Sequence, residues 1–169
     1  IGAAQAARSA GIGNVITFDM GGTSADISII EDGQPTFSQS NHLAGLPIPL
    51  PAVSMYSVGA GGGSYGWIDN GGLLKVGPES VGSDPGPACY GKGELAALTD
   101  AFLVCGYLNP DRFAAGNVQL YADRSLTALE PIARHLGMDA RSAADRMIQV
   151  AIANMYAELS AVMEQHGFD

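Results

Sequence analysis

The chain has 169 residues, 47% of them hydrophobic and 15% charged, a balance typical of a globular chain and unlike that of a disordered one. The formal net charge of −9 argues against a nucleic-acid partner, because neutralising phosphates requires clustered lysines and arginines. No hydrophobic run reaches the roughly eighteen residues that cross a membrane, so no membrane partner is expected either.

The length suits one domain, predicted here over residues 1–169. Most of the 23 glycines lie in the front of the chain, so we expect a glycine-rich sheet part over 1–98 and a helical part over 99–169. Because the sequence opens at Ile1 rather than at a methionine, we also expect it to be a fragment of a longer polypeptide.

In chain order, the front part reads as a short helix followed by strands and tight turns. The helix covers residues 3–10, and Asp32-Gly33 and Asn70-Gly71-Gly72 are typical of hairpin turns. Prolines 47, 49 and 51 favour an extended edge segment over 43–51. A long loop is expected over 77–93. The predicted strands are residues 15–18, 26–30, 34–39, 54–58, 67–69 and 73–76.

Three helices are predicted in the back part. The first is capped by Thr99, and the second covers 125–136, where Pro131 limits its regularity. The third begins after Asp139 or Ser142 and ends at Gly167. It is expected to span roughly 35–40 Å. One face of this helix is apolar: Ala144, Ile148, Ala151, Met155, Leu159 and Val162.

The stretch FDMGGTSADISII, residues 18–30, interrupts a good strand with a polar, glycine-rich patch. Its glycines allow a sharp turn and a close approach of backbone to ligand, and hydroxyls beside free N–H groups suit phosphate oxygens. Asp19 and Asp26 are hard carboxylates that can hold Mg²⁺ through water. A plain hairpin with solvated acids is the alternative. The predicted phosphate-binding residues are Gly21, Gly22, Thr23, Ser24 and Asp26.

A second glycine stretch, residues 58–64, nearly matches a dinucleotide-binding fingerprint, with Ser64 in place of the third glycine. A hairpin follows it instead of a helix, which argues against a Rossmann site. Its N–H groups can still wrap an anionic or carbonyl group, and a flexible linker is the alternative. The residues predicted to form this substrate or phosphate loop are Gly59, Gly61, Gly62, Gly63 and Ser64.

A third stretch, residues 77–91, combines stiffening prolines with bending glycines. No histidine lies in it, so Cys89 is more typical of a packed or site-lining thiol than of a nucleophile. Together with Cys105 it matches neither a disulfide framework nor a zinc-site spacing, which favours a cytoplasmic location.

Three quoted stretches together resemble the hydantoinase A / oxoprolinase family, in its hydantoinase A domain. They are FDMGGTSADISII, SVGAGGGSYGWIDNGGLLKVGPESVGSDPGPACYG and LTDAFLVCGYLNP. The family includes N-methylhydantoinase, 5-oxoprolinase and subunits of acetone and acetophenone carboxylases. The resemblance covers residues 11–109 and is specific because the three stretches occur together.

The resemblance implies an α/β fold with an actin-like ATPase (ribonuclease H-like) core, a mixed sheet with β-hairpins and C-terminal helices. It implies ATP and Mg²⁺ as cofactors and a cyclic amide, such as a hydantoin, 5-oxoproline or a lactam, as substrate. Phosphorylation would activate the carbonyl oxygen for attack by water. Asp19 takes a catalytic role, and Asp84 and Cys89 are placed near the site as further catalytic candidates.

Two departures from the family pattern limit what this stretch can do alone. The first phosphate hairpin and the adenosine-binding glycine segment are absent, so we expect the fragment alone to be inactive. We expect its partners to be the remainder of its own parent chain and a hydantoinase B-type subunit. Residues 154–159 lack the basic residues of many relatives, which leaves the substrate and the subgroup open. An ATP-dependent ketone carboxylase subunit is one alternative, and a non-catalytic nucleotide-holding module, a different class, is the other.

Overall fold

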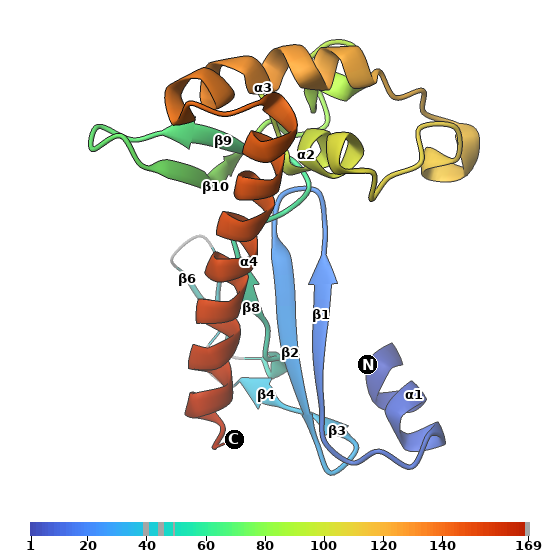
Figure 1. The fold of residues 1–169 in the computed structure, drawn as a ribbon. Helices are drawn as coiled ribbons and strands as arrows, with labels where there is room; N and C mark the ends of the chain where they lie inside the picture. The colour runs from blue at the N-terminus through green and yellow to red at the C-terminus, as the bar shows by residue number, and fades with distance from the viewer. Residues whose placement is uncertain (39–40, 44–45, 49, 168–169) are drawn as a thin grey trace. The chain divides into compact units, whose positions relative to one another are not determined.

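A computed structural model describes residues 1–38, 41–43, 46–48 and 50–167, and it forms two compact units (Figure 1). Unit 1 contains Ile1–Asp19 and Asp26–Ser57, whereas unit 2 contains Met20–Ala25 and Val58–Asp169. The tip of the first hairpin therefore belongs to unit 2 and its stem to unit 1. The single domain divided near residue 98 stays a prediction.

Unit 1 is built around a long antiparallel hairpin, followed by short strands. β1 and β2 pair with each other, and both β3 and β8 pair with β2. Asp32 and Gly33 both have positive φ, 49° and 73°, as the predicted tight turn requires. The elements are α1 (Gly2–Ser9), β1 (Val15–Met20), β2 (Ala25–Glu31), β3 (Gln34–Pro35), β4 (Phe37–Ser38), β5 (Asn41–Leu43), β6 (Leu46–Ile48), β7 (Ala52–Val53) and β8 (Tyr56–Val58).

The strand expected over 34–39 is divided into β3 and β4, which pair with different partners, β2 and β7. The proline-rich segment forms a small antiparallel pair of β5 with β6. Residues 39, 44, 45 and 49 of these predicted segments lie outside the described residues.

The first half of strand β2 separates an apolar face from a polar one, whereas Ile30, on the same face as Asp26 and Ser28, is buried. Ile27 and Ile29 are fully buried, whereas Asp26 and Ser28 between them are partly exposed. Because side chains alternate across a strand, both polar residues lie on the face opposite the isoleucines. This alternation turns the Asp26 carboxylate away from the core.

Unit 2 combines a β-hairpin with three helices. Strands β9 (Ser64–Ile68) and β10 (Leu74–Ser80) pair antiparallel, as the sequence predicts. Asp69 Oδ1 closes their turn by accepting the N–H groups of Gly71 and Leu73, each at 2.9 Å. The remaining elements are η1 (Ala88–Tyr90), α2 (Leu98–Cys105), η2 (Phe113–Gly116), α3 (Ala122–Leu136) and α4 (Ala140–Gln165).

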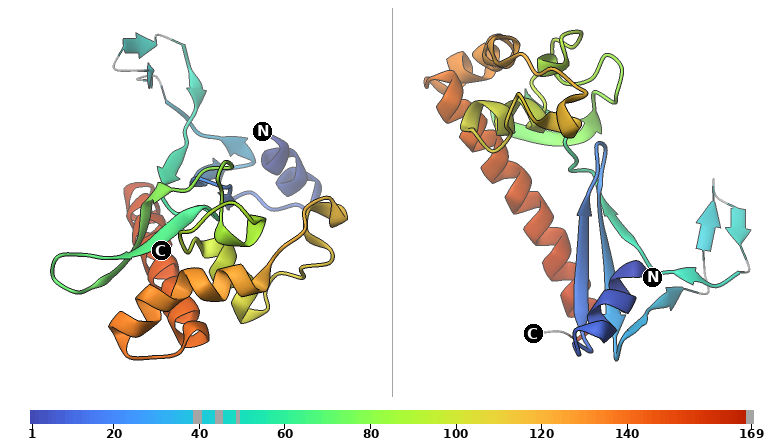
Figure 2. Two further views of the ribbon diagram at one scale, coloured as in Figure 1. Left: turned by 90° about the horizontal axis from the view of Figure 1, so that it is seen from above. Right: turned by 90° about the vertical axis from the view of Figure 1, so that its right-hand side faces the viewer.

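The core of unit 2 lies where α2, α3 and α4 meet the hairpin. Helix α3 lies across the N-terminal end of α4 (Figures 1 and 2). Small alanines on α4 let the helices approach closely around larger side chains. The core residues are Val76, Ala96, Leu98, Ala101, Leu129, Ile132, Ala133, Ala143, Ala144, Met147, Ile148 and Ala151.

The start of α4 and the end of α3 agree with the sequence, whereas α3 begins at Ala122 rather than at residue 125. Asp139 caps α4 by accepting the Ser142 N–H at 2.8 Å, and α4 has 26 residues, about 39 Å. Helix α3 continues through Pro131 to Leu136. The prediction that Thr99 caps α2 is wrong, because the N-cap is Ala97. Within the described part of the chain, no helix has the length and apolar character needed to cross a membrane.

Candidate functional site

The tip of the β1–β2 hairpin is a two-residue loop. Gly21 donates its N–H to the Ser24 carbonyl oxygen at 2.8 Å, which leaves Gly22 and Thr23 exposed at the end. Neither glycine has positive φ, so an unusual backbone conformation does not explain them. The contacts of the tip with the rest of the protein do not explain them either, since a Cβ on Gly22 would have no atom within 4 Å and one on Gly21 only the Ser24 carbonyl oxygen, at 3.3 Å.

The tip is held by its carbonyl groups. Gly62 donates its N–H to the Gly21 oxygen at 2.9 Å, and Gly63 donates its N–H to the Gly22 oxygen at 2.6 Å. Among the described residues, the N–H groups of Gly22 and Thr23 have no protein acceptor. Exposed neighbouring N–H groups of this kind form an anion-binding surface.

Glycines in the loop of residues 59–64 permit this backbone-to-backbone contact. A Cβ on Gly61 would lie 2.5 Å from the carbonyl carbon of Thr23 and 2.7 Å from that of Gly22. A Cβ on Gly63 would lie 2.9 Å from the Gly22 oxygen. Real Cβ atoms do not approach other atoms this closely, so any side chain here would push the loop and the tip apart.

The N–H groups of Gly61, Gly62, Gly63 and Ser64, which were predicted to wrap a ligand, are engaged within the protein. Those of Gly62 and Gly63 hold the tip, and that of Gly61 donates to Ser64 Oγ at 3.0 Å. Ser64 itself is fully buried. That this loop shapes the wall of a phosphate or substrate site stays a prediction, whereas its direct contact with the tip is observed.

Asp19 and Asp26 lie on the polar face of the hairpin stem in unit 1. Thr17 Oγ1 donates to the Ser28 carbonyl oxygen at 3.3 Å, and counting along both strands places Asp19 opposite Asp26. Ser57 Oγ donates to Asp26 Oδ1 at 2.7 Å. Both carboxylates line a pocket of about 260 Å³.

The two acids fit Mg²⁺ only if water completes the shell. Carboxylate oxygens are suitable ligands, and Mg²⁺ usually keeps several waters. Among the described residues there is no group of three or more His, Cys, Asp or Glu side chains that could enclose a metal. The arrangement is compatible with the predicted water-mediated binding, which stays a prediction.

Asp84 lies at the surface of the third stretch. Its carboxylate pairs with Lys92 Nζ at 3.2 Å, and both side chains are more than 70% exposed. An exposed pair of this kind contributes little to stability, so the ion pair with Lys92 is a weak structural reason for an acid at this position. Its catalytic role is untested.

Cys89 is fully buried against Leu103 and Leu120. Burial is the main cause that raises the pKa of its thiol, and the neighbouring Asp100 carboxylate raises it further. A neutral thiol is a poor nucleophile. These contacts favour the packed-thiol interpretation of Cys89 over a catalytic one.

The two cysteines are expected to react very differently with iodoacetamide. Cys105 is partly exposed, although burial also raises the pKa of its thiol, so at pH 8 it should be modified slowly in the folded protein. Cys89 should be modified only when urea unfolds the protein, because unfolding returns its thiol to the ordinary pKa of about 8.5. Mass spectrometry of each cysteine peptide measures this. Equal labelling of both without urea would contradict the buried position of Cys89.

Asp100 is a fully buried acid in the first turn of α2 that was not predicted from the sequence. Its Oδ2 accepts N–H groups from Ala88 at 3.1 Å and Ala97 at 2.9 Å. Its Oδ1 accepts the Cys89 N–H and the Ser125 hydroxyl, each at 2.7 Å. One carboxylate thus joins the third stretch, α2 and α3. The only available signal was an acid at a helix N-terminus, which is usually a surface cap.

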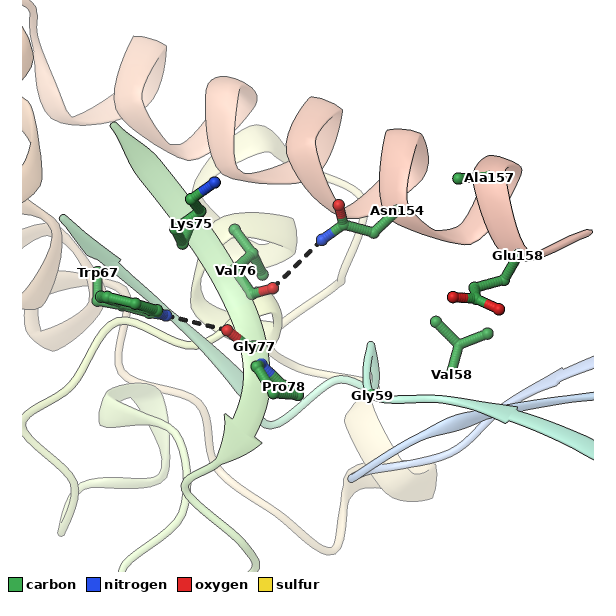
Figure 3. Close-up of a pocket in the computed structure, with 10 residues that line it drawn as sticks. All are labelled: Val58, Gly59, Trp67, Lys75, Val76, Gly77, Pro78, Asn154, Ala157 and Glu158. Atoms are coloured by element: carbon green, nitrogen blue, oxygen red, sulfur yellow. Dashed lines mark hydrogen bonds between the residues drawn. The ribbon is translucent and has the colours of Figure 1, made fainter. Parts of the chain in front are cut away.

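A second pocket, of about 370 Å³, lies between β10 and α4 and is bordered by Gly59 of the glycine-rich loop (Figure 3). Trp67 Nε1 donates to the Gly77 carbonyl oxygen at 2.9 Å, and Asn154 Nδ2 donates to that of Val76 at 3.4 Å. Gly59 and Pro78 form the wall shared with the loop, since a Cβ on Gly59 would lie 2.7 Å from Pro78 Cβ. The other lining residues are Val58, Lys75, Ala157 and Glu158.

Comparison with known proteins identifies the family. A family model described as Hydantoinase/oxoprolinase matches residues 1–169. The chain belongs to the hydantoinase/oxoprolinase family. It is 38% identical over 165 residues to the caprolactamase subunit alpha of Pseudomonas jessenii, covering 96% of this chain and 24% of that protein. It is 46% identical over 99 residues to the 5-oxoprolinase of Dictyostelium discoideum, covering 59% of this chain and 8% of that protein.

Solved structures of this family confirm the predicted fold class. The nucleotide-free structure of acetone carboxylase matches with a TM-score of 0.87 and 33% identity, over 99% of this chain and 24% of that one. The ATP-dependent caprolactamase of Pseudomonas jessenii matches with a TM-score of 0.81 and 39% identity, over 92% and 23%. This hydantoinase/oxoprolinase chain is an α/β chain of the actin-like ATPase type, with antiparallel hairpins and C-terminal helices. It spans about a quarter of the length of these relatives.

Proposed function

We propose that this chain is part of an enzyme that uses ATP to activate the carbonyl oxygen of a cyclic amide for hydrolysis. The observation that carries the proposal is the hairpin tip: its carbonyls are turned into the protein, and the N–H groups of Gly22 and Thr23 are left exposed. The caprolactamase relative, which its name describes as ATP-dependent, supports the choice of ATP.

In this proposal the tip binds the terminal phosphates. Gly21, Gly22, Thr23 and Ser24 supply N–H and hydroxyl donors, while Asp19 and Asp26 hold Mg²⁺ through water. Bound Mg²⁺ neutralises charge on the phosphate oxygens. The γ-phosphoryl group passes to the amide oxygen, and water then adds to the carbon. The ring C–N bond breaks as the nitrogen leaves and takes up a proton, and a second water cleaves the resulting acyl phosphate to a carboxylate and free phosphate. The protein contributes positioning and electrostatic stabilisation.

A ketone carboxylase subunit is the second candidate. The same phosphoryl transfer would activate a ketone or bicarbonate oxygen, and the high TM-score with acetone carboxylase favours it. For either reaction we propose that the remainder of the parent chain completes the nucleotide site. A hydantoinase B-type subunit is the proposed partner, since the relatives are named as alpha and beta subunits. The cytoplasmic location stays a prediction.

Substrate-dependent release of ADP tests the proposal. The full-length protein with its partner subunit should release ADP when caprolactam, 5-oxoproline or a hydantoin is added, and little without substrate. Release that requires both bicarbonate and acetone would favour the carboxylase instead. Nucleotide binding without turnover on any of these compounds would contradict both enzymes and favour the nucleotide-holding module.

A further inference from the structure

We propose that Gly61, Gly62, Gly63 and Thr99 are positioning residues that orient the hairpin tip toward its phosphate ligand. This inference rests on the proposed function, because it assumes that the tip binds phosphate. It adds a role for a loop whose own N–H groups are already engaged. It also makes Thr99, at the start of α2, part of the nucleotide machinery.

Two series of hydrogen bonds connect the body of unit 2 to the tip through the loop of residues 59–64. In the first, the N–H and the hydroxyl of Thr99 both donate to the Gly62 carbonyl oxygen at 2.8 Å, and Gly62 donates its N–H to the Gly21 oxygen. In the second, Val81 donates its N–H to the Gly63 oxygen at 2.9 Å, and Gly63 donates to the Gly22 oxygen. Each series ends on a tip carbonyl.

Peptide planarity converts these two contacts into the orientation of the binding donors. In a trans peptide the C=O and N–H groups point in opposite directions. The Gly21 carbonyl shares its peptide with the Gly22 N–H, and the Gly22 carbonyl shares its peptide with the Thr23 N–H. Holding both carbonyls toward the loop therefore turns both N–H groups outward. These are the two N–H groups that find no acceptor among the described residues.

Close packing makes the support rigid. Gly61 packs so tightly on the tip that no Cβ fits between them, and Thr99 is only 7% exposed. An unsupported glycine-rich turn would sample many conformations, and ordering it on binding would cost free energy. A tip ordered in advance keeps its donors in place before the ligand arrives.

The informative variant is Thr99→Val in the full-length protein, which keeps the shape and the N–H but removes the hydroxyl donor. We expect its affinity for ATP to fall about tenfold, the effect of losing one hydrogen bond, and its affinity for AMP to stay the same because AMP lacks the terminal phosphates. Thr99→Ser should restore ATP binding. Titration calorimetry with each nucleotide, beside a thermal melt, gives the ratio of the two affinities.

Gly61→Ala should have a larger effect, since the added methyl group meets tip backbone. Gly13→Ala is the matched control, because a Cβ there has only the Asp32 Cα nearby, at 3.9 Å; it should bind both nucleotides as the wild type does.

A Thr99→Val protein with a lowered melting temperature but an unchanged ratio of ATP to AMP affinity would overturn the positioning role of Thr99. It would leave the proposal that the tip binds phosphate standing. A wild-type protein that binds ATP and AMP equally would overturn the phosphate-binding tip, and the support with it.

Discussion

Replacing Asp19 with alanine is expected to lower substrate-dependent ADP release at least about 100-fold, the scale typical of losing one preorganised electrostatic group in an active site. The physical reason is that Asp19 and Asp26 lie on paired strands and line the same pocket. With one of them gone, the proposed Mg²⁺ would lose half of its protein ligands. The measurement is a coupled ADP assay on the full-length protein with saturating substrate.

The fold should survive this change, because Asp19 is exposed and lies on the polar face of the stem. Its melting temperature should match that of the wild type, which separates a catalytic loss from unfolding. Asp111→Ala is the matched control, since it removes an exposed acid far along the chain from the hairpin and should leave ADP release unchanged. Normal ADP release by the Asp19→Ala protein would refute a role for this carboxylate in binding Mg²⁺ or phosphate.

Replacing Asp100 with alanine is expected to lower the free energy of unfolding by about 3–5 kcal/mol. The carboxylate accepts three N–H groups and one hydroxyl in a fully buried position. Its removal leaves all four donors without a partner, and each buried unpaired donor costs about 1–3 kcal/mol. This is a large part of the total stability of a typical domain, about 5–15 kcal/mol. Urea unfolding followed by circular dichroism measures the change.

Two variants test whether this loss comes from the four hydrogen bonds. Asp100→Asn keeps the shape but places an NH₂ donor against N–H groups, so it should also be strongly destabilised. Ser125→Ala removes one donor and leaves the carboxylate paired with three others, so its effect should be only about 1 kcal/mol. A loss below about 1 kcal/mol for Asp100→Ala would show that water or a rearranged loop satisfies the donors.

Local patterns predicted most of the elements correctly. The strand predicted over residues 26–30 is observed as β2, and Asn70-Gly71-Gly72 forms the predicted β9–β10 turn. Asp139 capped α4 as its position suggests. These predictions succeeded because each depends on neighbouring residues, whose geometry the backbone fixes.

Contacts between distant segments were not predictable in the same way. Gly62 and Gly63 pair with Gly21 and Gly22 through main-chain atoms only. A contact that uses no side chains leaves no complementary pattern of residue types in the sequence. The glycines of the loop were therefore interpreted as ligand donors, whereas the N–H groups of Gly62 and Gly63 hold the tip. Asp100 was missed for a related reason, because three of its four partners are main-chain N–H groups, those of Ala88, Cys89 and Ala97.

The absence of side-chain space at Gly61 has a consequence for protein engineering. Because the loop of residues 59–64 and the hairpin tip touch through their main-chain atoms, side chains added to the loop at Gly61 or Gly63 would displace the tip. A chimera that receives the hairpin from another protein should work only if the matching loop is transferred with it. A library that randomises the loop alone should return mostly the original glycines at Gly61 and Gly63.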